Sequence, residues 1–128
     1  MNEEIDLPFM NMVILQGILF CKYKNTAMLT LAMAREMVQA RLQLLNGRSL
    51  PVCIRNFQGV LDFEPEARIY LNSPEAMEGI SAAAIVAEEF HTEMLSTKFC
   101  DLPSQIAPTY PCKSLEQAIK WLHPYTNY

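Results

Sequence analysis

Two short, almost continuously apolar segments constrain the fold of this chain more than any other feature. Residues 50–54 (LPVCI) and 80–87 (ISAAAIVA) lack the regular polar alternation of a strand with one face in water. Strands of this kind are typical of a sheet that helices cover on both faces. Because strand patterns alternate with helix patterns along the chain, we predict an α/β sheet with helical cover and right-handed connections.

The N-terminal part predicts a hairpin followed by a long helix. Residues 10–24 contain two apolar runs that are separated by a Gln-Gly pair, and glycine permits the positive φ of a tight hairpin turn. Thr30 is expected to cap the helix, in which apolar side chains recur every three or four residues up to position 45. Gly47 supplies a left-handed stop.

The remaining elements are predicted from start and stop signals. Proline favours the first turn of a helix, and a serine hydroxyl with a glutamine three residues later forms a capping box. The predicted elements are a short helix from Pro65, a second from Ser73-Pro74 to Gly79, a helix at 88–99, a short edge strand near 109–112 and a helix from Ser114 with Gln117.

Length and charge restrict the function classes. A chain of 128 residues forms one domain, over residues 1–128 with a core at about 10–123. The net charge is −4 and the ten basic residues are scattered, so nucleic acid is not an expected partner. The apolar stretches end within about ten residues, whereas a membrane span needs about twenty. With an acidic start and no secretory signal, we expect a cytoplasmic protein that does not span a membrane.

No catalytic or metal-binding motif is apparent. The four cysteines (Cys21, Cys53, Cys100, Cys112) form no CxxC pair and are interpreted as reduced thiols. His91 shares a predicted helix face with Glu88, but no second histidine completes a metal site. No GxSxG elbow, P-loop or GxGxxG sequence occurs. We therefore predict no enzyme activity, no cofactor and no metal.

The order of elements resembles that of a group of small bacterial STAS-like domains, which are related in fold to the anti-sigma-factor antagonists of sporulation. The resemblance covers about residues 10–123 and is carried by "LQGILFCKYKN", "NGRSLPVCIRNFQGV", "EARIYLNSPEAMEGISAAAIVA" and "SLEQAIKWL". It implies a STAS-like (SpoIIAA-like) mixed sheet with an N-terminal β-hairpin and helices covering mainly one face. It also implies a non-enzymatic role in binding a protein or a small molecule.

The resemblance further identifies a switch position that differs in this chain. In the phosphoregulated antagonists, a glycine-valine pair leads into an aspartate-serine motif whose serine is phosphorylated. Aligning that pair with Gly59-Val60 places Glu64, Pro65 and Glu66 over the motif. Proline and glutamate accept no phosphate, and a glutamate at a helix start is permanently charged. We therefore expect no phosphorylation switch here.

Three functions follow as alternatives. The first is a regulatory or interaction module, expected as a homodimer, that binds a protein partner at the strand-to-helix junction through Arg55, Asn56, Gln58, Asp62, Glu64 and Glu66. The second is a binder of a lipid or other small apolar ligand, because methionines and small alanines could border a lipid-transfer-like pocket. The third, a small enzyme, would need Glu64 or Glu66 to meet His91 or Arg55.

Overall fold

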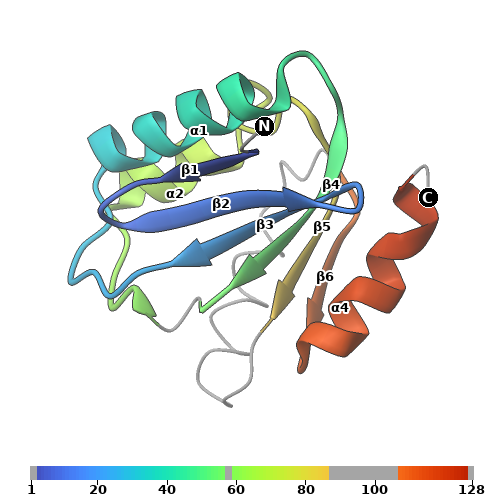
Figure 1. The fold of residues 1–128 in the computed structure, drawn as a ribbon. Helices are drawn as coiled ribbons and strands as arrows, with labels where there is room; N and C mark the ends of the chain where they lie inside the picture. The colour runs from blue at the N-terminus through green and yellow to red at the C-terminus, as the bar shows by residue number, and fades with distance from the viewer. Residues whose placement is uncertain (1–2, 57–58, 87–106, 127–128) are drawn as a thin grey trace.

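The computed structural model describes residues 3–56, 59–86 and 107–126. Within these ranges the chain forms a six-stranded sheet with helices on both faces (Figure 1). The predicted helix at 88–99 lies outside the described residues. The described elements are β1 (Glu4–Asp6), β2 (Met10–Leu15), β3 (Ile18–Tyr23), α1 (Leu31–Leu45), β4 (Leu50–Arg55), α2 (Pro65–Leu71), β5 (Ile80–Val86), β6 (Thr109–Cys112), α4 (Leu115–Leu122) and the 3-10 helix η2 (His123–Tyr125).

The strands lie in the sheet in the same order as in the chain, β1 to β6. β1, β2 and β3 pair antiparallel, whereas β3 to β6 pair parallel, so the sheet is mixed as predicted. The β2–β3 turn has positive φ at Gln16 (50°) and Gly17 (81°), which confirms the predicted hairpin. β6 lies at the edge of the sheet. Pro111 has no N–H to donate, and at an edge this removes no hydrogen bond from the central strands.

The short strand β1 has no counterpart among the elements that the sequence predicts. Its sequence, Glu-Ile-Asp, is too short and too acidic to give a strand pattern. Asn11 of β2 compensates, because its side-chain amide donates hydrogen bonds to the carboxylates of Glu4 (2.8 Å) and Asp6 (3.1 Å). β1 is therefore an edge strand that depends on its neighbour.

Both long helices begin at the predicted caps. The Thr30 hydroxyl accepts a hydrogen bond from the Met33 N–H at 3.2 Å. The C-cap of α1 is Asn46, with a φ of 51°, and the predicted Gly47 follows it with a φ of 85°. The Ser114 hydroxyl accepts one from the Gln117 N–H at 3.1 Å at the start of α4. These local signals fix where the two helices lie along the chain.

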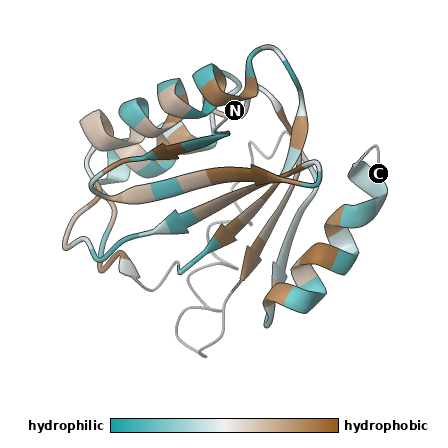
Figure 2. Ribbon diagram, viewed as in Figure 1, coloured by the Kyte–Doolittle hydropathy of each residue, from teal (hydrophilic) through white to brown (hydrophobic). Residues whose placement is uncertain are grey.

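Two core layers lie on opposite faces of the sheet. α1 and α2 cover one face and α4 covers the other (Figure 1). Successive residues of β4 serve different layers: Val52 packs in the α1–α2 layer and Cys53 in the α4 layer. Figure 2 shows hydrophobic residues along the central strands and hydrophilic residues alternating with them on both long helices. This double burial explains why residues 50–54 are apolar at successive positions.

The predicted second short helix, from Ser73 to Gly79, is wrong. The start signal works, because the Ser73 hydroxyl accepts a hydrogen bond from the Ala76 N–H at 3.2 Å, but the segment forms only turns. Gly79 ends it with a φ of 83°, and a Cβ added there would lie 2.7 Å from Leu45 Cδ1. The segment is thus one turn long, too short for a helix of its own.

Candidate functional site

The predicted junction residues lie at the carboxyl end of β4 and in the loop that leads to α2, except for Gln58, which lies outside the described residues. This loop runs beside the loop that follows β3. Parallel backbone hydrogen bonds join the two: the Thr26 N–H donates to Gly59 O at 2.7 Å, and the Leu29 N–H donates to Asp62 O at 2.9 Å. The junction is therefore a hydrogen-bonded extension of the β3–β4 pair.

Asn56 is a structural residue of this junction. Its backbone is left-handed, with a φ of 57°, a conformation that asparagine tolerates better than most residues. Its side-chain amide donates a hydrogen bond to the Tyr23 carbonyl at 2.7 Å, which links β4 to β3. A Cβ on Gly59 would lie 2.9 Å from the same amide nitrogen, so the glycine is required for this close approach.

Glu64 also has a structural task. It is the N-cap of α2, yet its carboxylate makes no cap bond to that helix. Instead Oε1 accepts a hydrogen bond from the Leu31 N–H at 2.7 Å, in the first turn of α1. A carboxylate at a helix N-terminus satisfies a free N–H group and complements the helix dipole. Glu64 therefore holds, in the loop before α2, a negative charge that stabilises the start of α1.

Asp62 and Glu66 are exposed at the same junction, whereas Arg55 is half-buried. In the described ranges, ion pairs join Lys24 to Asp6 and Arg48 to Glu3, and none joins Arg55 to an acidic side chain of the junction. His91, the other residue that an enzyme would need, lies outside the described residues. The arrangement gives no described acid–base pair at the junction.

Replacing Glu64 with alanine is expected to destabilise the protein by about 1–2 kcal/mol. The change removes the charged acceptor of the Leu31 N–H and leaves that donor of α1 without its partner. Urea unfolding would measure the loss. Glu66→Ala is the matched control, because Glu66 is exposed in the first turn of α2 and should cost only a few tenths of a kcal/mol. An equal loss of stability in the two variants would show that the hydrogen bond from the Leu31 N–H to Glu64 does not stabilise the protein.

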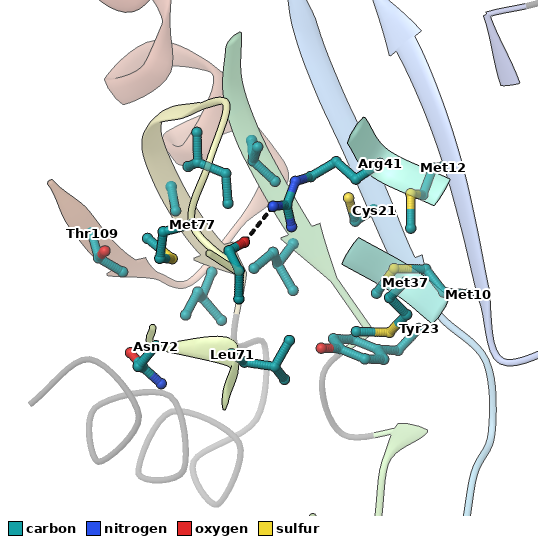
Figure 3. Close-up of a pocket in the computed structure, with 16 residues that line it drawn as sticks. Met10, Met12, Cys21, Tyr23, Met37, Arg41, Leu71, Asn72, Met77 and Thr109 are labelled. Atoms are coloured by element: carbon teal, nitrogen blue, oxygen red, sulfur yellow. Dashed lines mark hydrogen bonds between the residues drawn. The ribbon is translucent and has the colours of Figure 1, made fainter. Parts of the chain in front are cut away.

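A cavity lies away from the junction, between the sheet and the layer of α1, α2 and the turn that precedes β5. Its volume is about 90 Å³. None of the described residues of the predicted site lines it. Its lining side chains come from seven elements and that turn (Figure 3), and they are Met10, Met12, Cys21, Tyr23, Met37, Arg41, Val52, Ile54, Leu71, Asn72, Ala76, Met77, Ile80, Ala83, Ile85 and Thr109.

The cavity wall is mostly apolar and contains four methionines: Met10, Met12, Met37 and Met77. Methionine is unbranched and polarizable, so a wall of methionines adapts its shape to what it contacts. The strand floor includes the small residue Ala83, which leaves room above β5. A wall of this composition favours apolar groups, because it offers few polar atoms that could hydrogen-bond ordered water.

Arg41 is the exceptional residue of this wall. It belongs to α1, its side chain is on the cavity side, and it is only 7% exposed. Its Nη2 donates hydrogen bonds to the carbonyls of Ala76 and Glu78, the latter at 3.1 Å, while its Nε is buried without a partner. Figure 3 shows the guanidinium pointing toward the middle of the lining side chains. Burial lowers the pKa of Arg41, yet a guanidinium stays protonated in proteins.

The other titratable groups of the wall are held neutral. Burial raises the pKa of the Cys21 thiol to about 12, and burial also raises the pKa of the Tyr23 hydroxyl. Cys21 is a free thiol, as are Cys53 and Cys112, whereas Cys100 lies outside the described residues. Arg41 is therefore the charged member of the described cavity wall.

Sequence reasoning anticipated an apolar pocket only as an alternative and missed Arg41, although one signal for this residue was present. Arg41 lies four residues after Met37, three after Val38 and four before Leu45, on the apolar stripe of α1. A cation on a buried stripe needs an explanation, because burying a charge is costly. The position and lining of the cavity cannot be derived from the sequence, since they depend on how separate elements pack.

The described residues hold no cluster of three or more histidine, cysteine, aspartate or glutamate side chains suited to a metal ion. The predicted His91–Glu88 pair lies outside them. In the same part of the chain, no helix is long and apolar enough to cross a membrane.

The family described as a domain of unknown function, DUF7793, matches residues 12–126. The chain belongs to this family. The match to DUF7793 includes the whole cavity wall except Met10, and it includes the junction. No curated protein gives a significant match.

Among solved structures, this DUF7793 chain is similar to an uncharacterized protein of the DUF3478 family from Shewanella loihica PV-4, whose fold is described as SpoIIAA-like. The two chains share 13% sequence identity, with a TM-score of 0.59, and the similarity covers 88% of this chain and 91% of the other. At this identity the likeness concerns the fold alone. It confirms the predicted STAS-like, SpoIIAA-like fold.

Proposed function

We propose that the protein is a non-enzymatic binding module that holds a small apolar molecule in the cavity between the sheet and α1–α2. The observation that carries the proposal is the cavity of about 90 Å³ with its mostly apolar, methionine-rich wall. Small-molecule sites in proteins are concave and largely apolar, with a few polar groups that orient the ligand. This cavity has that composition, and Arg41, Asn72 and Thr109 are among its polar members.

The energetics of packing support a role for the cavity. Enclosed empty space in a core costs about 24 cal/mol per Å³, which sets an upper bound of about 2 kcal/mol for this partly open cavity. Leucine in place of Ala83 or Ala76 would fill part of it, and both alanines are buried in its wall. A ligand that fills the space recovers the lost contacts. The small side chains of Ala76 and Ala83 leave room for such a ligand.

The size of the cavity limits the ligand. An apolar protein cavity of about 150 Å³ holds one benzene ring. The cavity here is smaller, at about 90 Å³, but it is partly open to the surface, so a short hydrocarbon chain such as that of hexanoate enters with its far end at the opening.

The first test is a native mass spectrum of freshly purified protein. The proposal expects an additional mass that disappears on denaturation. The second readout is a titration with hexanoate and its uncharged counterpart hexanamide, followed by methyl NMR of [¹³C-methyl]methionine-labelled protein. Signals of Met10, Met12, Met37 and Met77 should move, whereas that of exposed Met28 should not. If neither probe moves the four signals and no extra mass appears, the proposal is wrong.

A protein partner at the junction is the second candidate. Leu61 is 78% exposed and Ile69 is 71% exposed, beside the exposed carboxylates of Asp62 and Glu66. Exposed apolar side chains with charged neighbours are typical of contact surfaces. A homodimer is the simplest such assembly. Sedimentation velocity over a hundredfold range of protein concentration tests this. A sedimentation coefficient that stays at the monomer value would show that the protein does not form a homodimer.

A further inference from the structure

Arg41 has an energetic problem that its protein contacts leave unsolved. A guanidinium carries five N–H donors and a permanent charge. Both of its hydrogen bonds come from Nη2 and end on backbone carbonyls, and its Nε, buried at the cavity wall, has no acceptor. No acidic side chain among the described residues forms an ion pair with it. The exposed carboxylate of Glu78 favours the charge of Arg41 from a distance but forms no ion pair with it. A buried charge without a paired opposite charge is costly.

A purely structural role explains only part of this arrangement. The two bonds from Nη2 tie α1 to the turn that precedes β5, and neutral donors could make the same bonds. A structural tie needs neither a permanent charge nor a guanidinium that faces an apolar cavity. The charge and the unpartnered Nε therefore point to an acceptor that none of the described residues supplies.

We propose that Arg41 binds the anionic group of the ligand, and that this ligand is a small apolar carboxylic acid. The inference rests on the proposed function, because it assigns a chemical class to the molecule in the cavity. A carboxylate supplies the negative charge that pairs with the guanidinium and the lone pairs that accept its N–H groups. The methionine-rich wall then contacts the hydrocarbon part.

The same geometry sets the specificity of the site. The thiol of Cys21 and the hydroxyl of Tyr23 are neutral members of the wall and add no second positive or negative charge. One cation in an otherwise neutral cavity selects a single negative charge. An uncharged amide or alcohol leaves the guanidinium unneutralised, and an amine places two like charges side by side.

The methionine-methyl titration tests this inference with hexanoate and hexanamide. We expect the wild-type protein to bind hexanoate at least tenfold more tightly than hexanamide, because a charge-assisted hydrogen bond in a dry site exceeds a neutral one by at least that factor. Arg41→Met keeps an apolar side chain of similar reach. It is expected to lower hexanoate affinity at least tenfold and to change hexanamide affinity by less than about threefold.

Arg35→Met is the matched control, since Arg35 is an exposed residue of the same helix and lies outside the cavity wall. Its hexanoate affinity should stay within about twofold of wild type. A merely structural Arg41 would affect both probes equally, so the ratio of the two affinities separates the roles. Should Arg41→Met fail to fold, the comparison of the two probes on wild-type protein decides alone.

The outcomes separate the two proposals. Equal affinity of the wild-type protein for both probes overturns the carboxylate inference and leaves the apolar cavity site standing. Unchanged hexanoate affinity in a folded Arg41→Met variant also overturns it. If neither probe moves the signals of the four cavity methionines, both proposals fall together.

Discussion

Replacing Ala83 with leucine is expected to abolish ligand binding while changing the free energy of unfolding by no more than about 1 kcal/mol. Ala83 lies in β5 with its side chain at the cavity wall, so the larger side chain extends into existing space. Filling a void restores contacts and avoids the strain of an overpacked core. Urea unfolding and the hexanoate titration measure the two effects on one protein.

The neighbouring alanine provides the control. Ala84 is fully buried on the opposite face of the same strand, in the core layer under α4, and lies outside the cavity wall. Ala84→Leu is expected to destabilise by about 1–3 kcal/mol and to leave hexanoate affinity unchanged. If Ala83→Leu is as destabilising as Ala84→Leu, the space beside Ala83 does not accept a side chain and the cavity cannot be as described.

The second large effect is expected for Leu122→Ala, at about 3 kcal/mol of lost stability. Leu122 is fully buried, and it anchors α4 to the sheet together with Ala118 and Cys112. Deleting most of a buried leucine side chain removes transfer free energy and leaves a void. Thermal and urea unfolding would both detect the loss. The hexanoate affinity of the folded variant should remain unchanged, because the two core layers lie on opposite faces.

Ile119→Ala is the comparison for Leu122→Ala, since Ile119 lies on the same helix and is 38% exposed. It should cost about 1 kcal/mol or less. A similar cost for the two variants would contradict the assignment of Leu122 as the anchor of α4. Weaker hexanoate binding in Leu122→Ala would show that the two faces are coupled.

Much of the fold follows from local chemistry that the sequence displays. Thr30 and Ser114 cap the two long helices through their hydroxyls, and the Gln16-Gly17 pair closes the hairpin with two positive φ angles. These hydrogen bonds and turns involve residues within three or four positions of each other, so the sequence alone is enough to predict them. The continuous apolar runs of β4 and β5 likewise reflect burial on both faces of the sheet.

The errors in the fold concern features that depend on distant neighbours. β1 needs Asn11 of the next strand to hold its acidic side chains, and the 73–79 segment is shortened by Gly79, which must fit against Leu45 of α1. Neither contact is visible in the local pattern. Tertiary packing decided both outcomes.

The site shows the same division. The junction was predicted from its place at a strand-to-helix transition, and the structure places Asn56 and Glu64 there, each as part of the scaffold with its own backbone partner. The cavity was anticipated only as an alternative, from methionines and alanines. Its cation, Arg41, was overlooked, because a single arginine on a long helix is usually exposed and only its neighbours on the stripe mark it as buried.

The most direct test of the account is a nuclear Overhauser spectrum of methionine-labelled protein saturated with hexanoate. The account predicts contacts between the methylene protons of hexanoate and the methyl groups of Met10, Met12, Met37 and Met77, which line the cavity. Contacts confined to the exposed Met28, or bound hexanoate with no contact to any of the four methyl groups, would contradict it.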